Sequence, residues 1–242
     1  MERERGITVK AQTVSFPYEF KYDDEIYSLN LIDTPGHVDF SYEVSRSLAA
    51  CQGVVLLVDA NSGVQAQTVA NFFLALERGL VVVPAINKID LPNAKPEETI
   101  AQIESLFGIE KDQVLRVSAK HGVGVEDLLD SIVERVPPPS GSLDKPLKAL
   151  VFDSWYNQFR GTVALVVVLE GRLGAGDKIE FYHSKRRETA HELGIFTPSE
   201  KAVSELRTGD VGFVLTGVKE AAEVQIGETI LTQGTTVEPV EG

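Results

Sequence analysis

Three polar clusters in this chain follow directly after apolar runs. They are DTPGH at residues 33–37, NKID at 87–90 and SAK at 118–120. The runs before them are rich in Val, Leu and Ile, which is typical of strands buried on both faces. Ligands of open α/β sheets bind at the carboxyl ends of the strands. The sequence therefore predicts that the three clusters lie on one rim of a sheet and bind a ligand there.

The second and third clusters carry groups that suit the recognition of guanine. The carboxylate of Asp90 can accept hydrogen bonds from N1–H and from the exocyclic amine of guanine, whereas adenine has no such pair of donors. The stem of Lys88 can lie over one face of the base, while Asn87 ties neighbouring loops together. The backbone N–H of Ala119 can donate to guanine O6. Each cluster alone also fits a surface turn, but in this order and spacing the three resemble the nucleotide-contacting motifs of GTP-binding proteins.

The first cluster carries groups that suit a phosphate and its metal ion. Asp33 can hold Mg²⁺ through a water molecule, because that ion keeps several of its waters. Gly36 can expose its backbone N–H to a γ-phosphate, and loss of that phosphate would release the loop. His37 follows, where it can orient the attacking water or stabilise charge in the transition state. The alternatives are an ordinary Thr-Pro-Gly turn and a metal pair of His37 with Asp39, for which no further ligand lies nearby.

The overall composition is that of a globular protein with little attraction for nucleic acids. Hydrophobic residues make up 43% of the 242 residues, charged residues make up 24%, and the net charge is −13. The apolar runs are far shorter than the ~20 residues of a membrane-spanning helix. The basic run at 185–187 favours a solvated hairpin tip, and we expect no independent nucleic-acid binding. The single cysteine, Cys51, excludes an internal disulfide, and its apolar neighbours predict a buried side chain rather than a nucleophile.

The order of elements predicts two domains. Between residues 27 and 136 strands alternate with helices, which implies right-handed crossovers and a mostly parallel sheet. Three prolines at 137–139 then stop helix formation and resemble a linker. Beyond them, β-rich runs separated by glycine turns predict a small β-barrel. The predicted strands of the first domain are 27–33, 53–60, 80–90 and 114–120, its helices are 38–51, 66–79, 96–107 and 125–136, and the barrel strands are 148–156, 161–171, 177–184, 210–218 and 228–233.

The chain resembles the translational GTPases of the elongation-factor class. RERGIT at residues 3–8, followed by DTPGHVDF at 33–40, carries this resemblance. Longer stretches such as ALVFDSWYNQFRG at 149–161 narrow it to elongation factor 4, the LepA type, including its mitochondrial homologue. The resemblance covers essentially the whole chain. It implies an α/β fold with a partial P-loop GTPase domain at 1–139, whose parallel sheet is flanked by helices, and a translation-factor β-barrel at 140–242.

The resemblance also implies a set of site residues and cofactors. GTP or GDP and Mg²⁺ are the expected cofactors, with Thr8 and Asp33 as the metal-binding residues and His37 as the catalytic residue. The second switch motif would consist of Asp33, Thr34, Pro35, Gly36 and His37. The guanine pocket would consist of Asn87, Lys88, Asp90, Ser118, Ala119 and Lys120.

One departure from the family pattern stands out, because the chain contains no G-x-x-x-x-G-K-[ST] loop and no Gly-Lys dipeptide. The strand before that loop lies in the middle of the sheet in this family. We therefore expect the strands near 29–33 and 54–58 to lack a shared neighbour. The simplest account is a fragment of a longer protein, cut within the first switch and ending after the barrel. Such a fragment should bind guanine nucleotides weakly, because the missing loop makes many of the phosphate contacts.

As a member of this family, the parent protein would be a GTPase that hydrolyses GTP on the ribosome, with tRNA present, and so regulates protein synthesis. It would lie in the mitochondrial matrix, with at most peripheral association with the inner membrane, or in a bacterial cytoplasm. Two alternatives remain open. One is a non-catalytic ribosome- or protein-binding fragment of a G-like domain, and the other is a different translational GTPase of the release or initiation class.

Overall fold

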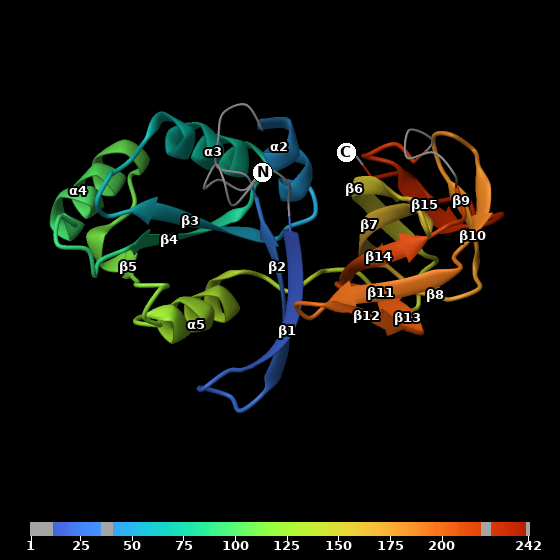
Figure 1. Ribbon diagram of the computed structural model, residues 1–242, viewed down its shortest axis with the longest axis horizontal. Coiled ribbons are helices and arrows are strands. Elements are labelled where there is room, and N and C mark those ends of the chain that lie inside the picture. The colour runs from blue at the N-terminus through green and yellow to red at the C-terminus, as the bar shows by residue number, and fades with distance from the viewer. Residues whose placement is uncertain (1–11, 35–40, 219–223, 241–242) are drawn as a thin grey trace.

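A computed structural model describes residues 12–34, 41–218 and 224–240 of the chain. The described chain consists of an α/β part and a β-rich part that lie side by side (Figure 1). The segment between α5 and β6, which includes the three prolines, contains no helix or strand. None of the helices in the described ranges is long and apolar enough to cross a membrane.

The α/β part is built on a parallel sheet in the order β3-β4-β5. Helices α3 and α5 lie on opposite faces of this sheet (Figure 1). Helix α4 begins at Pro96, which suits a first helical position, and ends before Gly108, whose φ of 68° lies in the left-handed region. The bounds are β3 (Gly53–Asp59), β4 (Val81–Asn87), β5 (Leu115–Arg116), α2 (Ser41–Leu48), α3 (Ala66–Glu77), α4 (Pro96–Phe107) and α5 (Val125–Arg135).

The remaining strands of the α/β part, β1 (Gln12–Glu19) and β2 (Ile26–Asp33), form a separate antiparallel hairpin. Within the described residues, β2 pairs only with β1 and β3 pairs only with β4, so the expected lack of a shared neighbour is confirmed. The prediction that 27–33 belongs to the parallel sheet was wrong. The physical reason is that no strand in the described chain lies between β2 and β3 to hydrogen-bond with both.

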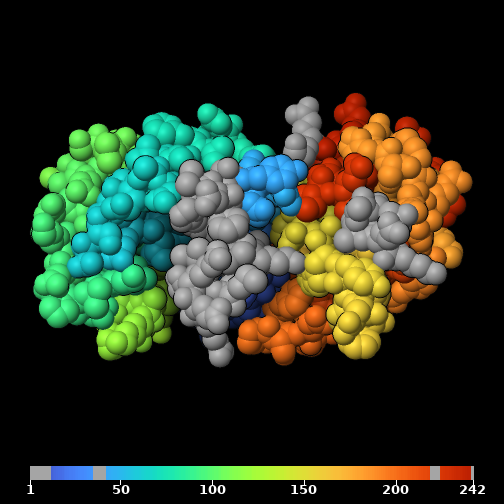
Figure 2. All heavy atoms as spheres, turned by 45° about the horizontal axis from the view of Figure 1, so that its top comes forward, coloured from blue at the N-terminus to red at the C-terminus, as the bar shows by residue number. Residues whose placement is uncertain are grey.

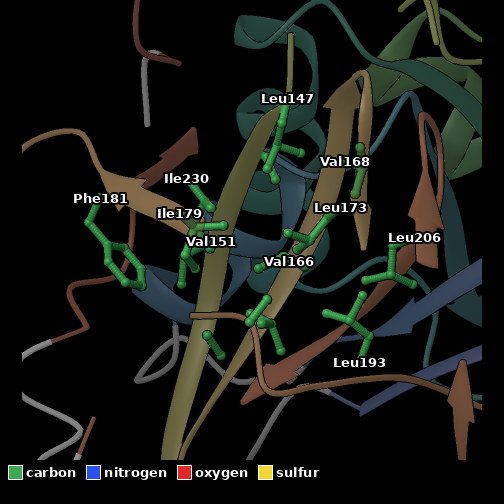
Figure 3. Packing of buried hydrophobic residues seen from close by; sticks show 14 of the residues in the cluster. Leu147, Val151, Val166, Val168, Leu173, Ile179, Phe181, Leu193, Leu206 and Ile230 are labelled. Carbon is green, nitrogen blue, oxygen red and sulfur yellow. The ribbon is translucent and has the colours of Figure 1, made fainter. Parts of the chain in front are cut away.

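The β-rich part contains a long antiparallel sheet whose order, among the described residues, is β10-β9-β15-β6-β7-β14-β11-β12, with β13 and β8 paired beside it. Its main core is filled by aliphatic and aromatic side chains that include Leu147, Val151, Val166, Ile179 and Phe181 (Figure 3). The bounds are β6 (Lys148–Asn157), β7 (Gly161–Glu170), β8 (Arg172–Gly174), β9 (Lys178–Phe181), β10 (Arg187–Thr189), β11 (Glu192–Phe196), β12 (Glu200–Val203), β13 (Glu205–Arg207), β14 (Val211–Leu215) and β15 (Thr229–Thr232). Each of the five predicted barrel runs contains a strand, and β6 extends one residue beyond its run.

The two parts share a second apolar cluster. Phe152, Leu165 and Phe213, on the outer face of the β-rich sheet, pack in one cluster with Ala50, which lies two residues after the end of α2. Ile32 of the hairpin packs against the same cluster. Figure 2 shows the blue atoms around α2 lying against the β-rich part. Burial of these side chains joins the two parts by the hydrophobic effect.

One smaller prediction from the sequence is confirmed, and the full burial predicted for the Cys51 side chain is not. Lys185, with a φ of 54°, lies in the turn between β9 and β10, so the basic run is a hairpin tip. Its neighbour Arg187 pairs with Glu180 at 2.9 Å. Cys51 is a free, half-buried cysteine, and burial raises the pKa of its thiol to about 11. The thiolate is therefore scarce at neutral pH, which argues against a nucleophile.

Candidate nucleotide site

The side chain of Asn87 connects the loop after β4 to the loop after β5. Asn87 is the last residue of β4, and its Oδ1 accepts hydrogen bonds from the backbone N–H of Lys88 at 2.7 Å and of Ala119 at 3.0 Å. The second of these contacts spans 32 residues of sequence. We predicted from the sequence that the Ala119 N–H can donate to guanine O6, whereas in this structure it donates to Asn87. Residues 87–90 and 118–121 therefore form one cluster at the carboxyl edge of the parallel sheet.

Asp90 is held by the loop that follows β5. The Ser118 hydroxyl donates to Asp90 Oδ1 at 2.5 Å, and His121 Nε2 lies 3.5 Å from Asp90 Oδ2. The hydrogen bond from Ser118 is the main cause that lowers the pKa of Asp90, and the nearby charges of His121 and Lys120 lower it further. Asp90 is therefore ionised at neutral pH and acts only as a hydrogen-bond acceptor.

Lys88 has an unusual backbone and a defined side-chain partner. Its φ of 63° lies in the left-handed region, which a non-glycine residue enters only at a cost. Its Nζ lies 2.7 Å from Oδ2 of Asp59, the last residue of β3. Burial alone would raise the pKa of Asp59, but Lys88 and the backbone N–H of Asn61 lower it overall. Strain of this kind is concentrated at functional sites, which supports a binding role for the loop.

The loop after β5 is closed by a small backbone bridge. Ser118 and Val123 exchange backbone hydrogen bonds of 2.9 and 3.2 Å. Gly122 and Gly124 have φ values of 74° and 71°, which glycine adopts without strain. Gly124 also precedes α5 directly, so its conformation sets both the loop and the start of the helix.

Replacing Gly124 with alanine is expected to destabilise the fold by about 2–4 kcal/mol, because a left-handed φ adds to a backbone clash. An added Cβ would lie 2.2 Å from the carbonyl oxygen of Arg116. Gly122→Ala is the matched control, because Gly122 has a similar φ but nothing lies within 4 Å of its added Cβ. We expect that control to cost about 1 kcal/mol, from the φ alone. Urea denaturation measures both, and equal losses would contradict the clash.

The structure brings together six of the residues predicted from the sequence, and it describes two more elsewhere. Asp33 ends β2, in a different sheet from the other clusters, and Thr34 follows it. Whether these two residues share a ligand with the cluster at 87–90 and 118–120 stays a prediction. The remaining predicted residues lie outside the described part of the chain, and they are Thr8, Pro35, Gly36 and His37.

Two side chains that contact these motifs, Asp59 and His121, were not predicted from the sequence. Asp59 is the last residue of an apolar strand, as Asp33 is, so its position along the chain was a signal. Its pairing with Lys88 depends on the register of β3 against β4, which the sequence does not specify. His121 directly follows Lys120, and nothing in its residue type pointed to Asp90.

Comparisons with known proteins place these motifs in a family. A family described as "Elongation factor Tu GTP binding domain" matches residues 1–138, and one described as "Elongation factor Tu domain 2" matches residues 161–231. A solved structure of bacterial selenocysteine-specific elongation factor EF-Sec aligns with 96% of this chain and 40% of its own, with a TM-score of 0.75 and 24% identity. At that identity the likeness shows the fold alone.

Curated relatives are more similar in sequence and cover the whole chain. The mitochondrial translation factor GUF1 homolog of Trichoplax adhaerens is 52% identical, and human mitochondrial translation factor GUF1 is 53% identical. Elongation factor 4 of Microcystis aeruginosa is 50% identical. The chain spans only 36% to 40% of the length of these relatives. They confirm the resemblance to elongation factor 4, and the match over residues 1–138 shows that the chain belongs to the translational GTPase family defined by the elongation factor Tu GTP-binding domain.

Proposed function

We propose that residues 87–90 and 118–121 bind the guanine base of GTP or GDP in a ribosome-associated GTPase of the elongation factor 4 type. The observation that carries the proposal is the single cluster in which Asn87 joins the two loops and Ser118 holds the Asp90 carboxylate. The ends of two neighbouring parallel strands, β4 and β5, supply this cluster, and ligands of open α/β sheets bind at such strand ends.

The donor and acceptor set of this cluster fits guanine. An ionised carboxylate offers about four acceptor positions, and Ser118 uses one of those on Asp90. The others can accept N1–H and the exocyclic amine of guanine. The Asp90 side chain is 23% exposed, so a base can reach it from solvent. Adenine would leave these remaining acceptor positions without donors, and an unpaired polar group in a site closed by its ligand costs free energy.

The proposal for the phosphate end of the nucleotide is based on the first polar cluster, residues 33–37, and on the family resemblance. Thr8 and Asp33 would hold Mg²⁺, and the bound ion would supply positive charge that offsets the charge of the phosphates. Thr34, Pro35 and Gly36 would form the loop around the terminal phosphate. His37 would position the attacking water, because phosphoryl transfer depends mainly on positioning and electrostatic stabilisation.

The domain division and the cellular setting belong to the same proposal. Residues 1–139 form a GTPase domain that lacks its first strand and phosphate loop, and residues 140–242 form the β-barrel domain. The parent protein binds the ribosome in the presence of tRNA and uses GTP hydrolysis to regulate protein synthesis. It acts in the mitochondrial matrix, with at most peripheral contact with the inner membrane, or in a bacterial cytoplasm. Support comes from relatives that are named mitochondrial translation factors or are bacterial.

The proposal is tested by titrating the isotopically labelled chain with GDP and, separately, with ADP. We expect GDP to shift the amide signals of residues 87–90 and 118–121, with a dissociation constant weaker than micromolar because the sequence has no Gly-Lys phosphate loop. ADP should shift them far less. Equal shifts with both nucleotides would contradict a guanine site.

A second experiment separates the GTPase from the non-catalytic alternative. The chain is sedimented with ribosomes in the presence of GTP, in the presence of GDP and without nucleotide. Binding that depends on the nucleotide supports the proposed switch. Binding of equal strength in all three conditions would favour a ribosome-binding module without catalysis.

A further inference from the structure

We propose that Asp59 is a positioning residue of the guanine site, which holds the ammonium group of Lys88 and thereby fixes the stem of Lys88 where a base can lie against it. This inference rests on the proposed function. It adds a residue from a third strand, β3, to a site that the sequence motifs confine to the loops after β4 and β5.

The parallel pairing of β3 and β4 brings the two side chains together. Asp59 is the register partner of Asn87, so its carboxylate lies one strand away from the loop that Lys88 begins. The backbone N–H of Ala60 donates to the Asn87 carbonyl at 2.9 Å, which extends this pairing by one residue. Asp59 Oδ2 then lies 2.7 Å from Lys88 Nζ, the distance of a charge-assisted hydrogen bond.

The carboxylate of Asp59 is itself held in place by the turn that follows β3. Its second oxygen, Oδ1, accepts the backbone N–H of Asn61 at 2.8 Å. The Asp59 carbonyl accepts the backbone N–H groups of Ser62 and Gly63 at 3.2 and 2.8 Å. Because these local bonds order the carboxylate, holding Lys88 requires little further ordering of Asp59.

Lys88 needs such a partner, because its side chain is long and mostly in solvent. A free lysine side chain populates many rotamers, and it loses this entropy when it is fixed. The Lys88 side chain is 54% exposed, so packing alone does not fix it. Its backbone is held in the left-handed region, with its N–H bound to Asn87. Asp59 therefore fixes the far end of a side chain whose near end is already held.

An ion pair that serves only stability is the alternative, and its energetics argue against it. Exposed ion pairs contribute little to the free energy of folding, so the pair adds little to the stability of the chain. The pair instead lies beside Asn87 and involves the strained backbone of Lys88. Both features match a binding site that depends on the position of its side chains. A positioning role also predicts that the effect of Asp59 on binding vanishes when Lys88 is absent.

That prediction is tested by a double-mutant cycle on GDP binding, with the amide-shift titration as the measurement. Asp59→Asn keeps an oxygen for the Asn61 N–H but removes the charge that holds Lys88. We expect this variant to weaken GDP binding about threefold to fivefold, the range of a partly exposed ion pair. Lys88→Met should weaken binding at least as much, and adding Asp59→Asn to Lys88→Met should change nothing further. Losses that add up in the double variant would overturn the proposal.

Two controls separate positioning from folding and from general charge effects. Asp112→Asn removes an exposed carboxylate in the short helix Lys111–Gln113 and should leave GDP affinity unchanged. The urea midpoint of Asp59→Asn should match that of the unmodified chain, because only the exposed ion pair is lost. A fall in the midpoint as large as that of Asp59→Ala, which also loses the Asn61 contact, would indicate a structural role and overturn the proposal.

A third measurement keeps the inference separate from the proposed function. In the chain without nucleotide, the Lys88 ammonium should give a resolved proton–nitrogen signal, because its pairing with Asp59 slows proton exchange, and Asp59→Asn should abolish that signal. If the unmodified chain fails to bind GDP while this signal is present, the proposed function fails and the Asp59–Lys88 contact stands. If GDP binds but the signal is absent in the unmodified chain, the inference fails and the proposed function stands.

Discussion

Replacing Asp90 with alanine should reduce the preference of this chain for GDP over ADP by about 100-fold. A site built to accept two donors from a base discriminates strongly against a base that lacks them, by 10⁴-fold or more when fully buried. Because the Asp90 side chain is 23% exposed, water can replace part of its hydrogen bonds to the base. We therefore expect a smaller discrimination between GDP and ADP. The ratio of the two dissociation constants, from the same amide-shift titration, is the measurement.

The reduced preference for GDP should result from lost contacts to the guanine base, and the fold of the variant should stay intact. Ser118→Ala provides the graded comparison, because it keeps the carboxylate but removes the hydroxyl that holds it at 2.5 Å. We expect Ser118→Ala to weaken GDP binding by about fivefold, the value of one hydrogen bond. Asp112→Asn should leave the ratio unchanged. A preference for GDP that survives in Asp90→Ala would mean that the base binds elsewhere.

The elements of the α/β part were predictable where local signals and periodicity agree. Helix α4 has the predicted bounds because Pro96 favours the first turn and Gly108 favours the end. Strand β5 was predicted over seven residues, but only Leu115–Arg116 pairs with β4. The chain turns at Ser118 to form the bridge with Val123, which a run of apolar residues does not reveal.

The hairpin shows why other features were not predictable. Strand β1 escaped prediction because Pro17 interrupts an alternating run, and proline within a run argues against a strand unless it lies at an edge. The pairing of β1 and β2 outside the parallel sheet depends on which strands are available, which is a property of the whole fold. The contact of Asp59 with Lys88 has the same origin, since the register of β3 on β4 creates it.

Asp130 should carry much of the attachment of this hairpin to the rest of the α/β part. It lies on α5, it is 4% exposed, and Oδ1 accepts the Tyr18 hydroxyl at 2.7 Å. Its Oδ2 lies 2.5 Å from Lys21 Nζ. Burial, and then the hydrogen bond to Asp130, raise the pKa of Tyr18 to about 12. Since β1 and β2 share no backbone hydrogen-bond ladder with β3, these side-chain contacts replace part of what a shared sheet would supply.

Asp130→Ala is therefore expected to destabilise the chain by about 2–3 kcal/mol and to speed hydrogen exchange in β1 and β2 more than in β4. Removing one member of a buried pair costs about 3–5 kcal/mol, and the half-exposed Lys21 reduces that cost because water can solvate it. Asp127→Ala is the matched control, on the same helix and 3.5 Å from the same lysine, but 70% exposed. Its cost should stay below about 0.5 kcal/mol. Equal losses from the two variants would contradict the role of the buried carboxylate.

The effect of Asp130→Ala on the unfolding free energy should depend on pH if the charge of Asp130 is responsible. A simple loss of packing would not give this pH dependence. Lys21, and then Tyr18, lower the pKa of Asp130 in the folded chain below the ordinary value of an aspartate. A lowered folded-state pKa contributes stability above the unfolded pKa of about 3.9, and that stability is lost as pH falls through the folded-state pKa. The difference in unfolding free energy between the unmodified chain and Asp130→Ala should thus stay constant from pH 8 to about pH 5 and shrink below about pH 4. Urea denaturation at pH 7, 5 and 3 measures it, and a difference at pH 3 as large as at pH 7 would assign the loss to packing instead of charge.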